Sequence, residues 1–284
     1  MLALAPGVAY IHEPFNPRTP AGISPAPFDR YFTVVTAENE ERFLPGLERT
    51  LAFRYGLAAQ VRSRHGALDL ARAGRDLARS LPPRLAGSRP LVKDPIALLS
   101  AEWLADRFGM QVVVLVRHPA AFAASLKRLG YRHDFASFVV DGTVPEIVRP
   151  YEREIREQAE RPGDVLAQAS LFWRILYGAV EGYRTRHPDW TYLRHEDASA
   201  DPLRTFEHLY AELRLELVPR ARLEIEQATS ASDNPAELRS PHDVKLASAE
   251  SLGRWRTQLS LDEIEQLRES TRDVWPSFYS DEDW

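Results

Sequence analysis

The chain has 284 residues, 44% of them hydrophobic, a formal net charge of −5 at pH 7 and no cysteine. This length supports one large α/β core, and the lack of cysteine excludes disulfide bonds, cysteine-ligated zinc and thiol catalysis. The negative charge argues against general attraction to nucleic acid or to an anionic membrane, so any anion-binding site must be local. No apolar run approaches the roughly 18 residues of a membrane span, and the N-terminal residues lack the basic flank of a signal peptide, so we expect a single cytoplasmic domain over residues 1–284.

The first predicted element is a short strand at residues 8–12, which a proline-rich loop follows. Between residues 37 and 80 apolar side chains recur at helical spacing, and this predicts two helices separated near a glycine. A second strand is expected at residues 90–94, after a loop that contains two adjacent prolines. An amphipathic helix at residues 97–108 comes next, and Gly109 ends it.

The apolar run at residues 112–116 is typical of a strand buried on both faces of a parallel sheet. Pro119 fits the first position of a helix, and the alanines after it favour the helical state. With the strand and helix before it, this run predicts a β-α-β unit. Arg117 therefore stands at the carboxyl end of a strand and beside free helix N–H groups, a setting that suits an anion. Ser125 follows eight positions later.

The second half of the chain predicts mainly helices. Residues 130–150 show no periodicity and predict a loop or lid on the substrate side. A strand at residues 190–194 runs into His195. Ser260 is expected to begin the last helix, with Glu263 as its capping-box partner. The predicted helices lie at residues 152–161, 166–186, 202–213, 219–227 and 261–273.

The spacing from Arg117 to Ser125 resembles the motif with which one family of enzymes holds the 3′-phosphate of its nucleotide. These are the sulfotransferases that use 3′-phosphoadenosine 5′-phosphosulfate (PAPS). The resemblance implies a three-layer α/β fold of the P-loop NTPase-like type, with helices flanking a mostly parallel central sheet. It also implies that PAPS is the donor and that no metal ion takes part.

Three further segments resemble nucleotide-contacting parts of that family. They are a strand that passes the adenine, where a histidine replaces a more usual tyrosine, a polar turn, and a C-terminal loop that closes over the nucleotide. The basic residues that often precede the glycine of that loop are replaced here by serine, alanine and glutamate. Because the segments occur in the family's order, the resemblance covers most of the chain. The contacts that it implies are His195, Thr229, Ser230, Gly253, Arg254 and Trp255.

The family's 5′-phosphosulfate loop, a turn rich in glycine, serine and threonine after the first strand, has no counterpart in the sequence. The residues from Met1 to Ala5 resemble the end of the helix that follows this loop. The loop supplies backbone N–H groups to the sulfonate, and one such donor is typically worth about 10²–10³-fold in rate. We expect either a start upstream of Met1 or an N-terminally truncated form that lacks the first strand, with impaired folding and activity.

Glu13, at the end of the first predicted strand, is the leading candidate for the base that activates the acceptor. The resemblance places an acidic residue here in some members, and we expect partial burial to raise its pKa. Its alternative roles are a turn cap or a pair with an arginine, and His12 and Asp94 are weaker candidates for the base. Lys93, at the neighbouring strand end, is expected to stabilise the transferred group, and its alternative is a solvated loop lysine.

Each predicted nucleotide contact also has a plainer alternative. Arg117 can form a structural ion pair at a strand end, and Ser125 can bond to its own helix backbone. Lys127 is interpreted as a surface charge, and Trp255 as either core filler or an adenine platform. The histidines of this region have no partners at convincing metal-ligand spacing, so no metal site is expected.

The sequence thus predicts transfer of a sulfuryl group to a hydroxyl or amine of a small-molecule or glycan acceptor. Two other classes stay open. One is a P-loop kinase-like nucleotide enzyme, although no G-x-x-x-x-G-K-[ST] motif is visible. The other is an inactive, sulfotransferase-like binding module, which the missing loop favours.

Overall fold

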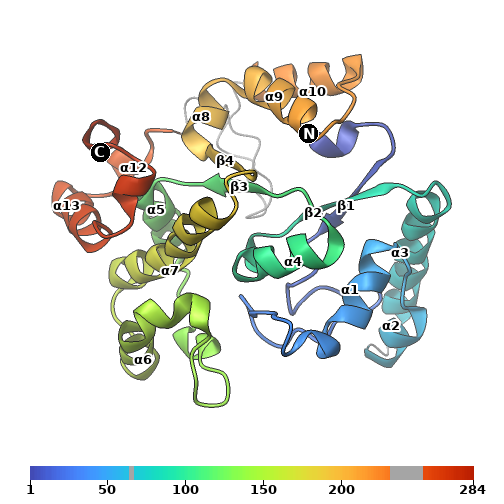
Figure 1. The fold of residues 1–284 in the computed structure, drawn as a ribbon, viewed down its shortest axis with the longest axis horizontal. Coiled ribbons are helices and arrows are strands. Elements are labelled where there is room, and N and C mark those ends of the chain that lie inside the picture. Colours follow the sequence, from blue (N-terminus) through green and yellow to red (C-terminus); the bar gives the residue numbers. More distant parts are fainter. Residues whose placement is uncertain (64–66, 231–251) are drawn as a thin grey trace. The chain divides into compact units, whose positions relative to one another are not determined.

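The four strands of the described residues form two separate parallel pairs, and helices make up much of the remaining chain (Figure 1). The computed structural model describes residues 1–63, 67–230 and 252–284. By its internal contacts the chain divides into two compact units, Leu2–Met110 and Gln111–Trp284, and Met1 belongs to the second. These elements confirm the α/β class.

In the first unit, strand β1 (Val8–His12) pairs in parallel with β2 (Arg89–Lys93), and His12 lies opposite Lys93. Parallel strands need a crossover connection, which helices provide here. Because the two strands run in the same direction, the carboxyl ends of β1 and β2 lie at the same edge of the pair. The crossover contains α1 (Leu44–Leu51), α2 (Leu57–Ser63) and α3 (Ala67–Leu85), and short 3₁₀ turns lie at Leu2–Leu4 and Glu40–Arg42.

The chain after β2 turns directly into helical structure. Asp94 caps the 3₁₀ turn Pro95–Ser100, because its Oδ1 accepts the backbone N–H groups of Ile96 and Ala97. Helix α4 (Ala101–Phe108) follows and ends at Gly109, whose φ of +60° is the left-handed conformation that glycine adopts at helix ends. The predicted helix at residues 97–108 is confirmed, and it includes this 3₁₀ turn.

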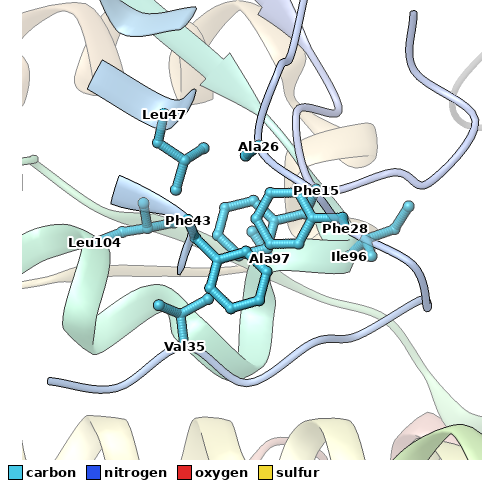
Figure 2. Packing of buried hydrophobic residues seen from close by; sticks show 9 residues of the cluster. All are labelled: Phe15, Ala26, Phe28, Val35, Phe43, Leu47, Ile96, Ala97 and Leu104. Carbon is cyan, nitrogen blue, oxygen red and sulfur yellow. The ribbon is translucent and has the colours of Figure 1, made fainter. Parts of the chain in front are cut away.

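Aromatic rings form the core of this unit, as Figure 2 shows. The ring centroids of Phe15 and Phe28 are 4.2 Å apart, and those of Phe28 and Phe43 are 4.9 Å apart. Gly46 lets α1 approach this core, because a Cβ there would lie 2.4 Å from the backbone of Ala26. The stacked rings anchor the loop after β1, since Phe15 is fully buried two positions after Glu13.

In the second unit, β3 (Val113–Val116) pairs in parallel with β4 (Thr191–Arg194), and Val116 lies opposite Arg194. Helix α5 (Pro119–Leu129) begins two residues beyond β3 with proline at its first position, as predicted. The other elements of the crossover are 3₁₀ turns at Phe135–Phe138 and Glu146–Tyr151 and helices α6 (Glu152–Glu160) and α7 (Val165–Arg186). After β4 come α8 (His195–Ala200), α9 (Pro202–Glu212), α10 (Pro219–Ser230), α12 (Trp255–Gln258), α13 (Leu261–Ser270) and 3₁₀ turns at Trp275–Ser277 and Asp281–Asp283.

Small side chains allow α5 to pack closely in the core of this unit. Ala120, Ala123 and Ala124 are buried at helical spacing and contact Leu166 and Ala169 of α7. Side chains of α12 and α13 complete this cluster, among them Trp255, Leu259 and Leu267. The N-terminus of α5 is therefore held from several sides.

The structure corrects several predictions about the fold. The three-layer P-loop-like sheet is not confirmed, because the described strands form two-stranded sheets. The predicted β-α-β unit around α4 is also not formed as a hydrogen-bonded pair, since β2 pairs with β1 and β3 pairs with β4. The loop expected at Pro82 and Pro83 is instead the last part of α3, which continues to Leu85.

Between residues 37 and 80, where two helices are predicted, three begin: α1, α2 and α3. Several other predictions about the elements are confirmed. The predicted strands agree with the observed ones to within one residue at each end, and Ser260 and Glu263 form the expected capping box. In the described part of the chain, none of the helices combines the length and the apolar composition of a bilayer-spanning segment. The single domain over residues 1–284 stays a prediction.

Candidate functional site

Two clusters of charged side chains lie at the carboxyl ends of the strand pairs, one in each unit. In the first, the parallel register places His12 opposite Lys93, and the backbone N–H of Glu13 donates to the carbonyl of Lys93 at 3.0 Å. The Lys93 ammonium then reaches Glu13 Oε1 at 2.8 Å. We call Glu13, Lys93, Asp94 and Asn16 the Glu13 cluster. The structure thus brings together the two predicted catalytic residues.

The backbone of Glu13 adopts an uncommon conformation. Its φ is +43°, in the left-handed region that non-glycine residues rarely occupy. Local contacts hold it there: Thr19 Oγ1 donates to the Glu13 carbonyl at 2.8 Å, and Asn16 Nδ2 donates to Glu13 Oε2 at 3.0 Å. Such conformations cost free energy and concentrate at functional sites, so this turn supports a role for Glu13 beyond packing.

The expectation that the Glu13 pKa is raised is wrong. Burial raises the pKa of this carboxyl, but hydrogen bonds from Lys93 and Asn16 lower it by more, and the net result is a pKa below the ordinary value. Glu13 is therefore ionised at neutral pH although only 7% of its surface is exposed. The predicted pair with an arginine is replaced by a pair with Lys93.

In the same cluster, the pKa of the Asp94 carboxyl is raised. Burial raises the pKa of Asp94 to about 6, although hydrogen bonds from the N–H groups of Phe15, Ile96 and Ala97 lower it. These three donors occupy both carboxylate oxygens, which join the loop after β1 to the turn after β2. His12, the other weak candidate for the base, places Nε2 3.9 Å from Glu13 Oε1. Asp94 thus has a clear structural task.

The second cluster begins at Arg117, directly after β3. The register that sets Val116 opposite Arg194 makes Arg117 and His195 the first residues beyond two neighbouring strands. The Arg117 backbone is fixed on both sides, because its N–H donates to the Tyr177 hydroxyl at 3.2 Å and its carbonyl accepts from Trp173 Nε1 at 2.8 Å. We call Arg117, Tyr177, His195, Glu196 and Tyr279 the Arg117 cluster.

The Arg117 side chain is partly buried. Its Nε is shielded from solvent and has no hydrogen-bond partner within residues 1–63, 67–230 and 252–284. Burial lowers the pKa of Arg117, and the nearby Tyr177 and Glu196 act in the opposite direction. Burial also lowers the pKa of His195, and the positive charge of Arg117 adds to this. Arg117 and His195 are therefore electrostatic neighbours.

His118 connects this cluster to the N-terminus of α5. It is 2% exposed, its Nδ1 accepts the backbone N–H of Ala120 at 3.2 Å, and burial lowers its pKa to about 3. Its ring stacks on Trp255, with centroids 4.9 Å apart. His118 is thus a neutral helix cap, and the part of the chain that the structure describes contains no group of three potential metal ligands.

The remaining predicted residues of α5 have different surroundings. Ser125 lies within α5 and is partly exposed. Lys127 is bound to Glu263, with Nζ and Oε1 2.6 Å apart, which agrees with its interpretation as a surface charge. Arg128 is exposed near the end of the same helix and repels Arg117 electrostatically, which lowers the pKa of Arg117 slightly further.

The predicted contacts in the C-terminal part are placed less favourably for a nucleotide. Trp255 is 4% exposed and belongs to the core, where it stacks on His118 and lies 4.2 Å from the Arg256 guanidinium. Gly253 and Arg254 form the turn before α12. The predicted polar turn differs from the structure at its start, because α10 continues to Ser230 and includes Thr229. The rest of this turn, Asn234-Pro235 included, lies outside the described residues.

Sequence reasoning missed three members of the Arg117 cluster. Tyr177 and Tyr279 are buried aromatic residues that looked like core, and Glu196 is one of two acidic residues after β4. The carboxylate of Glu196 accepts the His118 N–H at 3.0 Å and the Tyr279 O–H at 2.9 Å. No local signal identifies these residues, since their partners are 60 to 83 positions away in sequence.

We compared the chain with protein-family models, curated proteins and solved structures, and none of the three comparisons gave a match.

Proposed function

We propose that this protein is a sulfotransferase that binds PAPS through Arg117 and transfers the sulfuryl group to a hydroxyl or amine of a small-molecule or glycan acceptor. The observation that carries the proposal is the partly buried Arg117 side chain, whose shielded Nε has no partner among the described residues. It stands at the end of a parallel strand and beside the N-terminus of α5, where backbone N–H groups favour an anion.

The plainer alternative for Arg117 was a structural ion pair. In the described ranges Arg117 forms no ion pair, which supports the anion-binding role over that alternative. Burying a cation without a partner is costly, and an anion that arrives at the site recovers this cost. Ser125 and the exposed Arg128 lie on the helix that begins beside Arg117, so they extend the polar surface available to a phosphate.

The Glu13 cluster provides the groups for the chemistry. The acceptor oxygen or nitrogen bonds to the sulfur of PAPS while the bond from that sulfur to the 5′-phosphate oxygen breaks. Adenosine 3′,5′-bisphosphate leaves, and the acceptor loses a proton. Glu13 is an ionised carboxylate able to take that proton, and Lys93 carries a positive charge that suits the sulfuryl oxygens. Lys93 is half exposed, so it can leave Glu13 without breaking the core.

A second candidate function is a binding module without catalysis. The observation that favours it is the closed Glu13–Lys93 pair, which lowers the pKa of Glu13 and so makes it a weaker base. In this alternative the pair only stabilises the strand ends, and nucleotide binding at Arg117 is retained.

Calorimetry tests the proposed donor. We expect adenosine 3′,5′-bisphosphate to bind more tightly than adenosine 5′-phosphate, because only the bisphosphate carries the 3′-phosphate that Arg117 would hold. Binding of ATP with magnesium in preference to the bisphosphate would contradict the proposal and favour a kinase-like enzyme. Turnover of labelled PAPS with a panel of phenols, amines and glycans then separates the enzyme from the binding module.

A further inference from the structure

Glu196, the second residue of helix α8, is the carboxylate of the Arg117 cluster, and each of its two oxygens accepts a hydrogen bond. Oε1 accepts the backbone N–H of His118 at 3.0 Å, and Oε2 accepts the hydroxyl of Tyr279 at 2.9 Å. The first bond ties Glu196 to the start of α5, and the second ties it to the C-terminal segment. One carboxylate therefore joins three parts of the second unit.

The same carboxylate lies close enough to Arg117 to interact with it electrostatically. Arginine and carboxylate side chains that meet in proteins frequently form bidentate pairs. Here they do not, and Arg117 Nε has no partner in the described residues. The two hydrogen bonds that Glu196 accepts hold its carboxylate toward the His118 backbone and the Tyr279 hydroxyl.

We propose that Glu196 is a positioning residue that keeps the Arg117 guanidinium available for an anion, because the His118 backbone and the Tyr279 hydroxyl already hold its carboxylate. The Glu196 charge also weakens the attraction of the site for anions, so its placement sets the affinity. This inference rests on the proposed function in one respect: the anion used in the test is the 3′-phosphate of a nucleotide.

Tyr279 is well fixed for this task. It is 5% exposed, its ring lies edge-on to His118 at a centroid distance of 4.9 Å, and the Arg194 guanidinium lies 4.6 Å from its ring centroid. Arg194, the last residue of β4, is held in turn by an ion pair with Asp283. The C-terminal segment thereby sets the orientation of Glu196, and through it the availability of Arg117.

Two conservative variants are expected to change the affinity in opposite directions. Glu196→Gln keeps an oxygen for the His118 N–H and offers its amide to the Tyr279 hydroxyl, but it removes the negative charge. We expect it to bind adenosine 3′,5′-bisphosphate about three- to tenfold more tightly. Tyr279→Phe frees one oxygen of Glu196 to pair with Arg117, and we expect binding about five- to tenfold weaker.

The double variant Glu196→Gln/Tyr279→Phe separates positioning from a structural role. If Tyr279 acts through the Glu196 carboxylate, its loss has little further effect once the charge is gone, so the double variant binds like Glu196→Gln. Tyr210→Phe is the matched control, because Tyr210 is 1% exposed and its hydroxyl donates to the Met1 carbonyl at 3.0 Å. We expect this control to bind like the unmodified protein.

Calorimetry with the bisphosphate, and a thermal-shift titration with inorganic phosphate as a second probe, give distinct outcomes. Weaker binding by both single variants, or no change in either, overturns the inference and leaves the proposed function standing. Opposite shifts with inorganic phosphate but no selectivity for the bisphosphate support the inference and overturn the proposed donor. Failure of the unmodified protein to bind either probe overturns both.

Discussion

The Glu13 cluster and the Arg117 cluster are built on the same geometric plan but treat charge differently. Each lies directly after a pair of parallel strands, with His12 opposite Lys93 in one and Val116 opposite Arg194 in the other. In the Glu13 cluster, opposite charges meet at 2.8 Å. In the Arg117 cluster, a nearby carboxylate is engaged elsewhere and the partly buried cation has no described hydrogen-bond partner at Nε.

This difference indicates a division of tasks. In an ion pair the mutual attraction offsets part of the desolvation cost, and a substrate must draw one partner away before the other charge becomes available. An unsatisfied buried cation is costly until an anion arrives, so it favours binding. Under the proposed function, this difference agrees with a chemical role for the Glu13 cluster and a nucleotide-binding role for the Arg117 cluster, and each role can be tested alone.

The largest expected effect concerns turnover. Glu13→Gln removes the proposed base, and we expect the rate of sulfuryl transfer to fall by about 10²–10⁴-fold while bisphosphate binding is unchanged. Labelled-donor assays and calorimetry measure the two quantities. Glu48→Gln, an exposed glutamate of the same unit, serves as the matched control. Normal turnover in Glu13→Gln would remove Glu13 from the mechanism and leave the cluster a structural pair.

The next effect concerns affinity. Arg117→Met keeps the apolar stem but removes the cation, and we expect bisphosphate affinity to fall by about 30- to 150-fold, equivalent to about 2–3 kcal/mol. Arg153→Ala removes an exposed arginine of α6 and is expected to leave the affinity unchanged. Equal affinities in Arg117→Met and in the unmodified protein would contradict the assignment of this cluster.

A smaller expected effect is the pH dependence of stability, which differs between His118, beside the Arg117 cluster, and Glu13. Burial holds the pKa of His118 at about 3, so the folded protein keeps it neutral while the unfolded chain takes up a proton below its ordinary pKa of 6.5. Stability is therefore lost as pH falls from 6.5 towards 3, by about 2 kcal/mol at pH 5. Glu13, whose pKa is lowered, contributes stability that is lost only as pH falls below its ordinary value of 4.5.

His118→Asn removes the contribution of His118 to the pH dependence of stability, because asparagine retains a helix-capping side chain that does not titrate. We expect its melting temperature to change less between pH 7 and pH 5 than that of the unmodified protein. His208→Asn, at an exposed histidine, provides the control. An unchanged pH dependence in His118→Asn would show that His118 is not the neutral cap described above.

The smallest effect concerns the Glu13 pair itself. Lys93→Met removes the hydrogen bond that lowers the Glu13 pKa, so burial then dominates and the pKa should rise. Carboxyl-carbon NMR during an acid titration measures this shift. Lys127→Met offers a comparison in the other unit, because the partly exposed Glu263 also loses a hydrogen bond that lowers its pKa. An unchanged Glu13 pKa in Lys93→Met would show that the Glu13–Lys93 pair does not lower this pKa.

Much of the local structure is predictable because it depends on nearby residues. The apolar runs identify all four described strands, Pro119 and Ser260 identify helix starts, and Gly109 identifies a helix end. The proximity of Glu13 and Lys93 follows from the same reasoning, since both come at the ends of predicted strands. Strand pairing was harder to predict, because hydrogen bonds between strands form across long stretches of sequence.

The sequence by itself determined where Arg117 stands, at a strand end beside a helix start, because strand and helix signals are local. Only the tertiary structure decided that the Nε of this arginine is shielded and has no partner in the described residues, since that depends on side chains such as Glu196 and Tyr279, which approach from distant segments. Tertiary structure also reversed the expected pKa of Glu13: burial favours the neutral acid, but the Lys93 ammonium, 80 positions away in sequence, favours the carboxylate by more.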